Sequence, residues 1–506
     1  MADMQVNNKD FDHSEPLDLH KWSEHPEVDD LVNVIWNKYF IEKFANDQLN
    51  SKAKAKPKVQ FKLLFLNLYV LWVKDPELVL GISLTRNHYT AKSRYNAIGI
   101  SQLMTTLVHH LHEVKLIELH KGSEAAKRTT RIWPSQRLTN YFQTAKFSPL
   151  DIGRYNDEEV IILNSKDYKS DRNKPIEYSD EDHPDILQWR EELQKYNDLI
   201  AKVFIDVPTL ISTSYTKVNA NDRGEEITHT TYIGQDVKRV KRIFYRGDWN
   251  LGGRFHGGWW QQVGSDLRNQ IYINDKPTVE IDFKGLHVGL LYMQQGEEPP
   301  RDPYAIRPIE FDIGDMKQRK LVKLLALTAI NAKSEKAAYG AFRSAQETGS
   351  VVKSLKDKQL KSVLDAFREH NEPIKDQIAT DKGVELMAID GRITAHVIKK
   401  FTEQNIPILS VHDSYIIQHT KEQLLAEAME EGIEKEFGYN YRIFLEEGEG
   451  NIVNFHSLLH RDNPDHINPF AIDIQRQRIL KKQELPRTPE YLSRMEEFQK
   501  RNNFNI

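Results

Sequence analysis

Two aspartates, each at the end of an apolar segment, are the residues of this chain best suited to chemistry. Asp282 follows T-V-E-I, and Asp413 lies within N-I-P-I-L-S-V-H-D-S-Y-I-I. Magnesium prefers hard oxygen ligands and is usually held by one or two carboxylates together with substrate phosphates. Two such ions about 3.5–4 Å apart activate the attacking hydroxyl and stabilise the leaving oxygen of a phosphoryl transfer. Acids often end strands, so the hypothesis requires these two to meet.

The neighbouring residues predict how each aspartate is presented. The alternation in T-V-E-I-D predicts a strand that ends at Asp282, and Gly285 then begins a turn into a helical stretch. Residues 408–411 and 415–417 predict two short strands joined by a bend that contains Asp413. We therefore expect a hairpin with an acid at its tip. An aspartate that merely caps its own turn is the alternative.

A basic helix is expected between the two aspartates. Arg319 and Lys323 lie four positions apart in K-Q-R-K-L-V-K-L-L-A-L-T-A-I-N-A and therefore share one helix face. Two cations on one face suit a triphosphate, which accepts charge-assisted hydrogen bonds. Taken alone, such a pair is also typical of a solvated basic face.

The order of these segments resembles motifs A, B and C of the family A DNA polymerases and the single-subunit phage-type RNA polymerases. The corresponding segments are 278–292, 319–332 and 408–417. The tip V-H-D-S-Y is most similar to the RNA polymerase branch. Upstream, R-G-D-W-N-L-G-G-R-F-H-G resembles the segment that precedes motif A in that branch, and downstream L-M-A-I-D-G-R-I-T resembles the helix that enters motif C.

The resemblance implies a role for each matched residue. Asp282 and Asp413, with the backbone carbonyl of Phe283, would hold two Mg²⁺ ions, for which Mn²⁺ is a substitute. Lys323 would be catalytic with the two aspartates, because it would meet the phosphates and give a proton to the leaving pyrophosphate. The nucleotide-binding residues would be Arg319, Lys323, His287 and Asn331. The residues that bind nucleic acid would be Arg254, His412, Arg246 and Arg268.

The chain departs from the family pattern at two places in the expected nucleotide site. Asn331 and Ala332 stand where the helix usually has Tyr-Gly, so a ring that stacks on the nucleotide and senses its sugar is missing. His287 stands where the DNA polymerases have a glutamate, five positions after the motif A aspartate. An imidazole there would either crowd a 2′-hydroxyl or hydrogen-bond to it, and the sequence allows both.

The sequence predicts an α+β fold: a right-hand-like polymerase with an antiparallel palm and helical fingers, preceded by a helical and winged-helix region. We expect an N-terminal helical segment with a basic linker at 1–58 and a winged-helix-like domain at 59–145. A connecting, thumb-like helical region is expected at 146–235 and the palm and fingers core at 236–465. A polar helical tail at 466–506 is expected to pack loosely.

Residues 101–134 show the pattern of a winged helix. A helical stretch is followed by two short strands around Gly122, with cations at the tip of the hairpin: Lys121, Lys127, Arg128 and Arg131. In such a domain a helix lies in a groove of the nucleic acid and the hairpin lies against its backbone. We expect Arg131 to bind nucleic acid, and a module for protein contacts or a spacer is the alternative.

Aromatic and basic residues alternate just before the first aspartate, in V-K-R-V-K-R-I-F-Y-R-G-D-W and R-F-H-G-G-W-W-Q-Q-V. Cations can follow a nucleic-acid backbone while rings stack on its bases. We expect Trp259 and Trp260 to take part in such stacking, and a buried tryptophan pair is the alternative.

Composition excludes several classes of protein. The 70 Lys and Arg residues against 74 Asp and Glu give a net charge of −4, so nucleic acid must be met by local basic patches. The absence of cysteine excludes disulfides, thiolate metal sites and cysteine nucleophiles, and it fits a cytoplasmic location. The polar N-terminus is unlike a signal peptide. The longest apolar run, 63–73, contains Asn67 and is too short to span a bilayer, so no membrane partner is expected.

Together these features favour a nucleotidyltransferase that adds nucleotides to a 3′ end by two-metal phosphoryl transfer. Template-directed DNA synthesis is preferred, because a bulky residue at His287 tends to exclude ribose; nucleoside triphosphates and a DNA template and primer would be the partners. An RNA polymerase or primase of the same superfamily is the first alternative. A catalytically decayed DNA-binding replication initiator is the second, against which both aspartates and the Arg-x-x-x-Lys pair argue. A metal-dependent nuclease, with Glu280 as an extra acid, is the third. The sequence does not indicate an oligomeric state.

Overall fold

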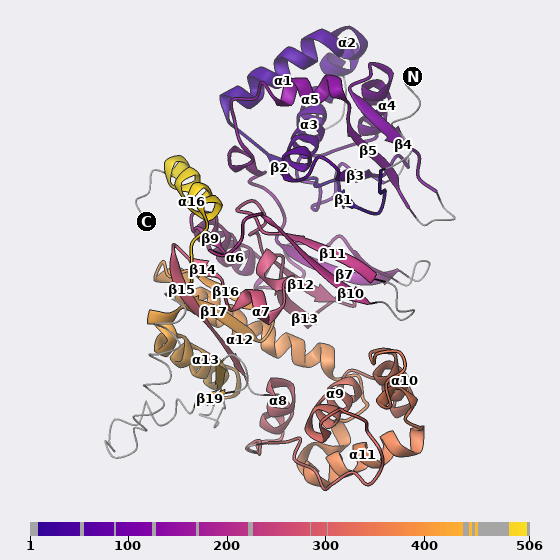
Figure 1. Cartoon of the computed structure of the whole chain (residues 1–506), viewed down its shortest axis with the longest axis vertical. Helices are drawn as coiled ribbons and strands as arrows, with labels where there is room; N and C mark the ends of the chain where they lie inside the picture. The colour runs from indigo at the N-terminus through magenta and orange to yellow at the C-terminus, as the bar shows by residue number, and fades with distance from the viewer. Residues whose placement is uncertain are drawn as a thin grey trace. The chain divides into compact units, whose positions relative to one another are not determined.

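The computed structural model describes residues 9–50, 55–85, 88–123, 128–167, 172–220, 226–283, 285–300, 302–438, 445–447, 451–453 and 485–502. The chain forms two compact units, Met1–Glu159 (unit 1) and Val160–Ile506 (unit 2). Figure 1 shows the helices and strands of both units.

Unit 1 is built around a helix with apolar residues on almost every side. This helix, α3 (Pro57–Lys74), has proline in its first turn and buries most of its length. A helix that is apolar all round must be enclosed by other elements. Those elements are α1 (Pro26–Tyr39), α2 (Ile41–Asn50), α4 (Leu103–Glu113), the strands β2 (Lys21–Trp22), β3 (Val79–Ile82) and β5 (Thr130–Pro134), and the short turn η2 (Pro149–Asp151).

A four-stranded sheet completes unit 1, in the order β1 (Ser14–Pro16), β3, β5 and β4 (Ile117–His120). Strand β1 runs parallel to β3, and the other neighbours are antiparallel. Helix α4 followed by the β4–β5 hairpin is the helix-and-hairpin pattern predicted for 101–134. The hairpin leads into α5 (Gln136–Phe142). Residues 124–127, which include Lys127, lie outside the described residues.

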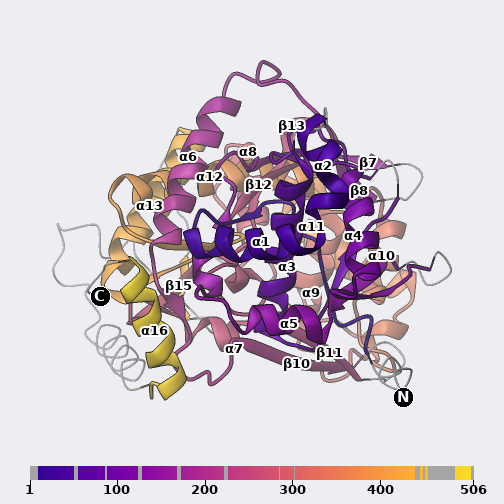
Figure 2. The ribbon, with the colours of Figure 1, turned by 90° about the horizontal axis from the view of Figure 1, so that it is seen from above.

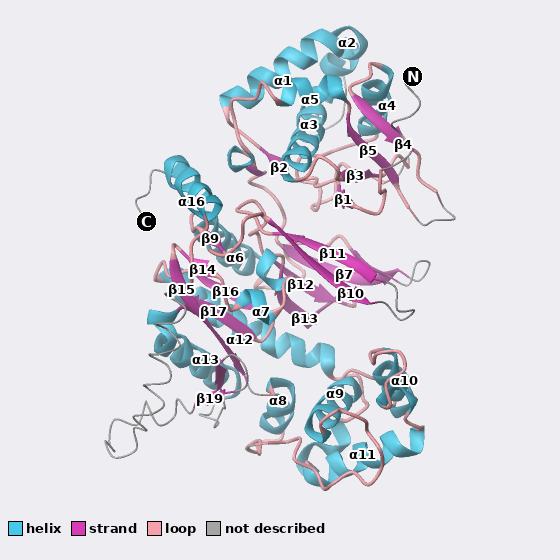
Figure 3. Ribbon diagram, viewed as in Figure 1, coloured by secondary structure: helices cyan, strands magenta, loops and turns pink. Residues whose placement is uncertain are grey.

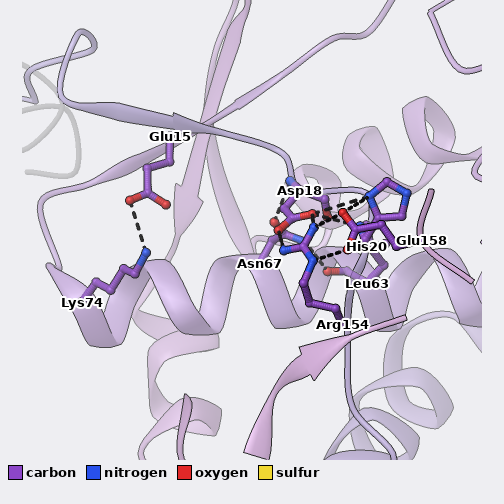
Figure 4. Close-up of polar contacts among 8 residues, drawn as sticks. All are labelled: Glu15, Asp18, His20, Leu63, Asn67, Lys74, Arg154 and Glu158. Atoms are coloured by element: carbon purple, nitrogen blue, oxygen red, sulfur yellow. Dashed lines mark hydrogen bonds and ion pairs between the residues drawn. The ribbon is translucent and has the colours of Figure 1, made fainter. Parts of the chain in front are cut away.

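A charged network ties the first strands of unit 1 to its last residues. Arg154, at the end of β6 (Gly153–Arg154), donates to both carboxylate oxygens of Asp18 at 2.7 and 3.1 Å and to Glu158 at 2.7 Å (Figure 4). Asn67 of α3 accepts from the Asp18 amide and donates to its carbonyl, each at 3.0 Å. Burial alone would raise the pKa of Asp18, but the adjacent Arg154 holds it well below its usual range. The network therefore stays ionised and fixes both ends of unit 1 to its central helix.

Unit 2 contains the sheet expected to carry the aspartates. Its strand order is β16, β17, β15, β14 and β9, with β18 and β19 added beside β15. The bounds are β9 (Ile205–Asp206), β14 (Tyr272–Ile273), β15 (Lys276–Phe283), β16 (Ile408–Val411), β17 (Ser414–Gln418), β18 (Leu445–Glu447) and β19 (Asn451–Val453). All of these pairings are antiparallel, as the sequence predicts for a palm.

A second sheet of unit 2 has the order β13, β12, β7 and β8, and β10 and β11 form a separate hairpin. The bounds are β7 (Ile161–Asp167), β8 (Arg172–Pro175), β10 (Ser214–Ala220), β11 (Glu226–Tyr232), β12 (Lys241–Tyr245) and β13 (Asp248–His256). The prediction of a helical connection over 146–235 is therefore wrong for the described residues, where one long helix, α6 (Ile186–Ala201), stands among strands. Alternating threonine, tyrosine and valine residues favour the β10–β11 strands.

The part of unit 2 that lies between the two aspartates in the sequence is mostly helical (Figure 3). Helix α8 (Leu286–Gln294) follows β15; α9 (Gln318–Ile330) packs against α10 (Glu335–Ser344) and α11 (Asp357–His370). The longest helix, α12 (Gly383–Glu403), leads from this group to the sheets, where it packs on β13, β16, α6 and α13 (Glu422–Phe437). The shorter helical elements are η3 (Trp259–Gln261), α7 (Ser265–Arg268), η4 (Val352–Ser354), η5 (Glu372–Gln377) and η6 (His419–Lys421).

The last described helix, α16 (Pro489–Asn502), is firmly packed on unit 2 (Figure 2). Tyr491 and Phe498 are buried, and Arg494 binds both oxygens of buried Asp206 at 2.7 and 3.2 Å. The expectation of a loose tail is wrong here because its few aromatic residues fall on one helix face. The rest of the predicted tail, up to residue 484 and from 503, lies outside the described residues.

The chain is thus a mixed α+β protein with several small sheets. In the part of the chain that is described, no helix has both the length and the apolarity needed to cross a bilayer.

Candidate functional site

Strand register brings the two predicted aspartates to one end of the sheet. Asp282 on β15 lies opposite Ser414 on β17, and Asp413 directly precedes Ser414. Paired Cα atoms across an antiparallel ladder are about 4.5–5.5 Å apart and consecutive ones 3.8 Å, so the Cα atoms of the two aspartates lie within about 9.5 Å. Residues far apart in the sequence therefore share one sheet end.

Tight backbone turns present both acids at this end. Val411 pairs with Ser414, so His412 and Asp413 form a two-residue hairpin loop, as predicted. His412 has a left-handed φ of 58°, which costs a non-glycine residue roughly 1–2 kcal/mol. Gly285 has a φ of 66° and starts α8 directly after β15. Such strain is often stored at functional sites.

The edge strand of the hairpin is held from outside the sheet. Tyr196 of α6 donates to the carbonyl of Ile408 at 2.8 Å, and Trp260 donates to that of Ser410 at 3.0 Å. Trp259 and Trp260 are fully buried, so the prediction that they stack on bases is wrong and the buried pair is correct. Trp260 satisfies one carbonyl of a strand edge, which otherwise exposes backbone groups, and the ring of Trp259 packs against that of Trp260 at 6.2 Å.

A buried ion pair lies behind the acids and joins β13 to α12. Asp390 of α12 is fully buried and accepts from Nε of Arg254 on β13. Gly391 follows Asp390, and a Cβ there would collide with the carbonyl oxygen of Gly253. The close approach of helix and strand therefore requires glycine at 391. Burial raises the pKa of Asp390 to about 7, although Arg254 acts to lower it.

The same arginine fixes the proton of His287. Nη2 of Arg254 lies 2.9 Å from Nε2 of His287. A guanidinium only donates, so Nε2 must accept and the proton sits on Nδ1. Burial and the charge of Arg254 lower the pKa of His287 to about 4, against the opposing effect of Asp413. His287 is therefore neutral near pH 7.

The buried hydroxyl of Tyr415 is affected by the charges of three acids of this site. Burial raises the pKa of Tyr415 well above its usual value, and the charges of Asp390, Asp413 and Asp282 raise it further. The Tyr415 hydroxyl lies 2.9 Å from that of Thr394 on α12. The buried hydroxyl is thus close enough to all three acids to be affected by their charges.

Two further histidines lie at the rim of this sheet end. The rings of His256 and His412 are 5.8 Å apart. Burial, then the charges of His412 and Arg254, lower the pKa of His256 to about 4; burial also lowers that of His412. Both are neutral near pH 7, so Arg254 and Arg268 supply the local positive charge.

The predicted cations lie on α9, as expected, but differ in their contacts. Arg319 binds Asp302 at 2.7 Å and lies over the ring of Tyr304. Lys323 is half-buried and has no hydrogen bond or ion pair within the described ranges. Asn331 is the C-cap of α9, is exposed and donates to the carbonyl of Leu327 at 2.7 Å.

The remaining predicted residues are engaged in local contacts. Arg268 binds both oxygens of Glu280 at 3.0 and 3.1 Å. Arg246 is exposed and pairs with Asp381 at 3.0 Å. Phe283 is buried at the end of β15. In unit 1, Arg131 donates to the carbonyl of Phe11 at 2.9 Å and to Thr129.

Asp390 and Tyr415 are part of this site, although sequence reasoning gave neither a role. The signal for Asp390 was an acid in the middle of the apolar pattern L-M-A-I-D-G-R-I, directly before a glycine. A buried acid in a helix needs a partner, and a following glycine indicates close backbone contact.

The two carboxylates at this sheet end are candidate ligands for magnesium. Within the described ranges, no three His, Asp or Glu residues cluster as a complete metal site. Magnesium does not require one, because it usually takes one or two carboxylates and completes its shell with water and phosphate oxygens. Asp282 and Asp413 are hard oxygen donors at one end of the sheet, and as a donor set they fit such an ion.

Comparison with known proteins gives little beyond this geometry. No protein-family model and no curated protein matches the chain. A solved structure, the POL domain of Pol1 from M. smegmatis in complex with DNA primer-template and dNTP, is similar over 42% of this chain and 47% of that one. The TM-score is 0.28 and the sequence identity 9%. The similarity thus spans less than half of that structure's chain.

Proposed function

We propose that the chain is a nucleotidyltransferase that extends the 3′ end of a nucleic acid, with template-directed DNA synthesis as its preferred reaction. The observation that supports this best is the register of Asp282 opposite Ser414, which joins two predicted acids at one sheet end. The order of acid, basic helix and acid along the chain agrees with it.

In the proposed reaction a 3′-hydroxyl oxygen attacks the α-phosphorus of a nucleoside triphosphate. A new oxygen–phosphorus bond forms as the hydroxyl proton passes to water, the bond from that phosphorus to the β-phosphate oxygen breaks, and pyrophosphate leaves. The protein would contribute positioning and charge rather than covalent chemistry. Asp282, Asp413 and the carbonyl of Phe283 would hold Mg²⁺, which when bound would activate the hydroxyl and stabilise the leaving oxygen.

The other residues would act on the nucleotide and the primer. Lys323, without a partner in the described ranges, would bind the phosphates and protonate the leaving pyrophosphate. Arg319 would exchange Asp302 for the γ-phosphate. His287, held neutral by Arg254, would lie beside the sugar. His412, at the hairpin tip, would lie at the primer end.

The nuclease alternative is disfavoured by the state of Glu280. This acid lies on β15 two residues before Asp282, but Arg268 grips both of its oxygens and the Ser414 hydroxyl donates to it at 2.7 Å. Its lone pairs are therefore committed to the fold. It is a poor third ligand for a nuclease metal cluster.

The test is an incorporation assay with the full chain. Purified protein is incubated with Mg²⁺, labelled dNTPs or NTPs, and primed, unprimed or no template. We expect extension of a primed DNA template with dNTPs. Preference for NTPs on unprimed template would instead support the RNA polymerase or primase alternative.

Two variants test the aspartates one at a time. Asp282→Asn and Asp413→Asn should each lower incorporation by at least about 10³-fold, since each removes a charge that acts on the transition state. Binding of primed DNA, measured by anisotropy without metal, should stay within about twofold. Full incorporation by both variants would contradict the proposal, and inactive wild-type protein that still binds DNA would favour the decayed initiator.

A further inference from the structure

A pocket of about 550 Å³ lies in unit 1, away from the aspartates in the sequence. It is formed by the residues after β3, by one residue of α4 and by the two sides of the β4–β5 hairpin. Its lining residues are Ser83, Leu84, Thr85, His109, Lys121, Gly122, Ser123, Arg128, Thr129 and Thr130. The volume is within the range of small-molecule sites, about 300–1,000 Å³.

Among the described residues, the lining is rich in donors and contains no acid. Lys121 is exposed and makes no hydrogen bond or ion pair in the described part of the chain. Nε of Arg128 is buried and has no hydrogen-bond partner there. Within the described part of the chain, Arg128 contacts the acid Asp12 at 3.4 Å, and the Asp12 side chain is 85% exposed, so water or a ligand competes easily for that pair.

The hydroxyls of the lining are held as acceptors by the protein. The Thr130 oxygen accepts from the Gly122 amide at 3.2 Å, and the Thr129 oxygen accepts from Arg131 at 2.7 Å. The Ser83 oxygen accepts from the Thr85 amide at 3.3 Å. A hydroxyl that accepts in this way still has its own hydrogen to donate. The pocket therefore offers donors to a ligand and few acceptors.

Positive charge is also concentrated behind the hairpin. Arg131 lies three positions after Arg128 in the chain. The pKa of Arg131 is lowered mainly by burial and secondly by the charge of Arg128. An anion in the pocket would relieve this repulsion. Arginine and lysine beside hydroxyl donors are the groups that bind phosphate most strongly.

We propose that this pocket binds a phosphate ester, carried either by a nucleic-acid strand or by a free nucleotide. The site is independent of the aspartates of unit 2 and would exist even if unit 2 catalysed nothing. Lys121 and Arg128 would contact the phosphate oxygens, and the hydroxyls of Thr129, Thr130 and Ser83 would donate hydrogen bonds.

The experiment measures binding by the full chain in EDTA, so that no catalysis contributes. One arm uses a fluorescent single-stranded oligonucleotide and the other a fluorescent nucleoside triphosphate. The test variant is Lys121→Gln with Arg128→Gln. The control is Lys43→Gln with Lys146→Gln, which removes the same charge from unit 1 at two residues that do not line the pocket.

For a strand, each phosphate contact adds about 0.7 to the slope of log affinity against log salt. Losing two contacts should weaken binding about 25-fold near 0.1 M salt and lower the slope by about 1.4. Lys121→Gln alone should weaken it about fivefold; because Lys121 is exposed, this variant does not depend on the fold tolerating loss of Arg128. The control should change affinity by less than about twofold.

The two arms identify the source of the phosphate. A loss confined to the oligonucleotide assigns the pocket to a strand, and a loss confined to the triphosphate assigns it to a nucleotide. Equal losses in the test and control variants, or no loss with either probe, would overturn the proposal. Asp282→Asn should keep the full pocket-dependent affinity, so failure here is distinct from failure of the proposed function.

Discussion

The sheet end that carries the aspartates and the face of α9 that carries the cations are built in different ways. Asp282 and Asp413 are fixed by strand register and by a two-residue loop, and Arg254 on the neighbouring β13 is fixed by its ion pair with buried Asp390. Arg319 and Lys323 share a face only because helix geometry places them four positions apart. Arg319 is 47% exposed and bound to an exchangeable acid.

This difference separates preorganised charge from mobile charge. Groups that must meet developing charge in the transition state work best when they are fixed beforehand. Cations that bind an incoming triphosphate benefit instead from side chains that can move with it. The comparison predicts that changes at the sheet end affect both activity and stability, while changes on α9 affect activity alone.

After the aspartate variants, the largest effect is expected from Lys323→Ala on α9. Turnover should fall about 10²-fold, since a donor to the transferring phosphates is lost. Arg319→Ala should cost less, about tenfold, because Asp302 already competes for that guanidinium. Steady-state kinetics check both, and the unfolding midpoints should not move. A fall in template affinity with unchanged turnover would move Lys323 from the nucleotide to the nucleic-acid backbone.

The next effect is on stability and uses two glycines as a matched pair. Gly391→Ala places a methyl group against the Gly253 carbonyl, so α12 must shift from β13, at a cost of about 1–3 kcal/mol in the free energy of unfolding. Gly340→Ala in α10 meets nothing within 4 Å and should stabilise by about 0.5–1 kcal/mol. Urea unfolding measures both. Equal effects would show that the sheet end is no more tightly fixed than the helical group.

These same regions show what the sequence alone could predict. The hairpin of 408–418, the turn at Gly285 and helix α9 follow from local alternation, glycine and helical period, and they were predicted. The pairing of Arg254 with Asp390 joins residues 136 positions apart, and no local pattern indicates which buried acid meets which cation. For Trp259 and Trp260, base stacking was preferred to burial. The reason is that a sequence of aromatic and basic residues is the same whether it forms a strand edge or binds a nucleic acid.

A third prediction concerns His287 on α8, the helix that lies between β15 and α9 in the sequence. Its imidazole is held by Arg254, so it is as fixed as the acids. If it restricts the sugar, His287→Ala should narrow the preference between dNTPs and NTPs about tenfold or more, within the range that one small contact supplies. Competition between labelled dNTP and NTP in one reaction checks this. An unchanged ratio with lower total turnover would mean that His287 serves only to orient Arg254.

The last expected effect is a dependence of stability on pH, and it concerns buried Lys238 beside α16. Lys238 is buried, donates to the carbonyls of Val203 and Ala201 at 2.7 and 3.2 Å, and lies 5.0 Å from the ring of Phe498 on α16. Burial lowers its pKa to about 7. An unfolded lysine keeps its proton up to about pH 10.4, so between these values the unfolded state binds more protons and stability rises with pH.

The contribution of Lys238 should therefore grow more favourable from pH 7 to pH 9, by at most about 1.4 kcal/mol per pH unit. Lys238→Met keeps the apolar stem and removes the titration. The difference in free energy of unfolding between wild type and variant isolates this residue, because all other titrations cancel. A difference that is constant over this range would mean that the two carbonyls keep the ammonium charged. In that case Lys238 stays charged while it donates to the carbonyls at the end of α6 and contacts Phe498 of α16. The packing of α16 would then be no more sensitive to pH than the cation face of α9.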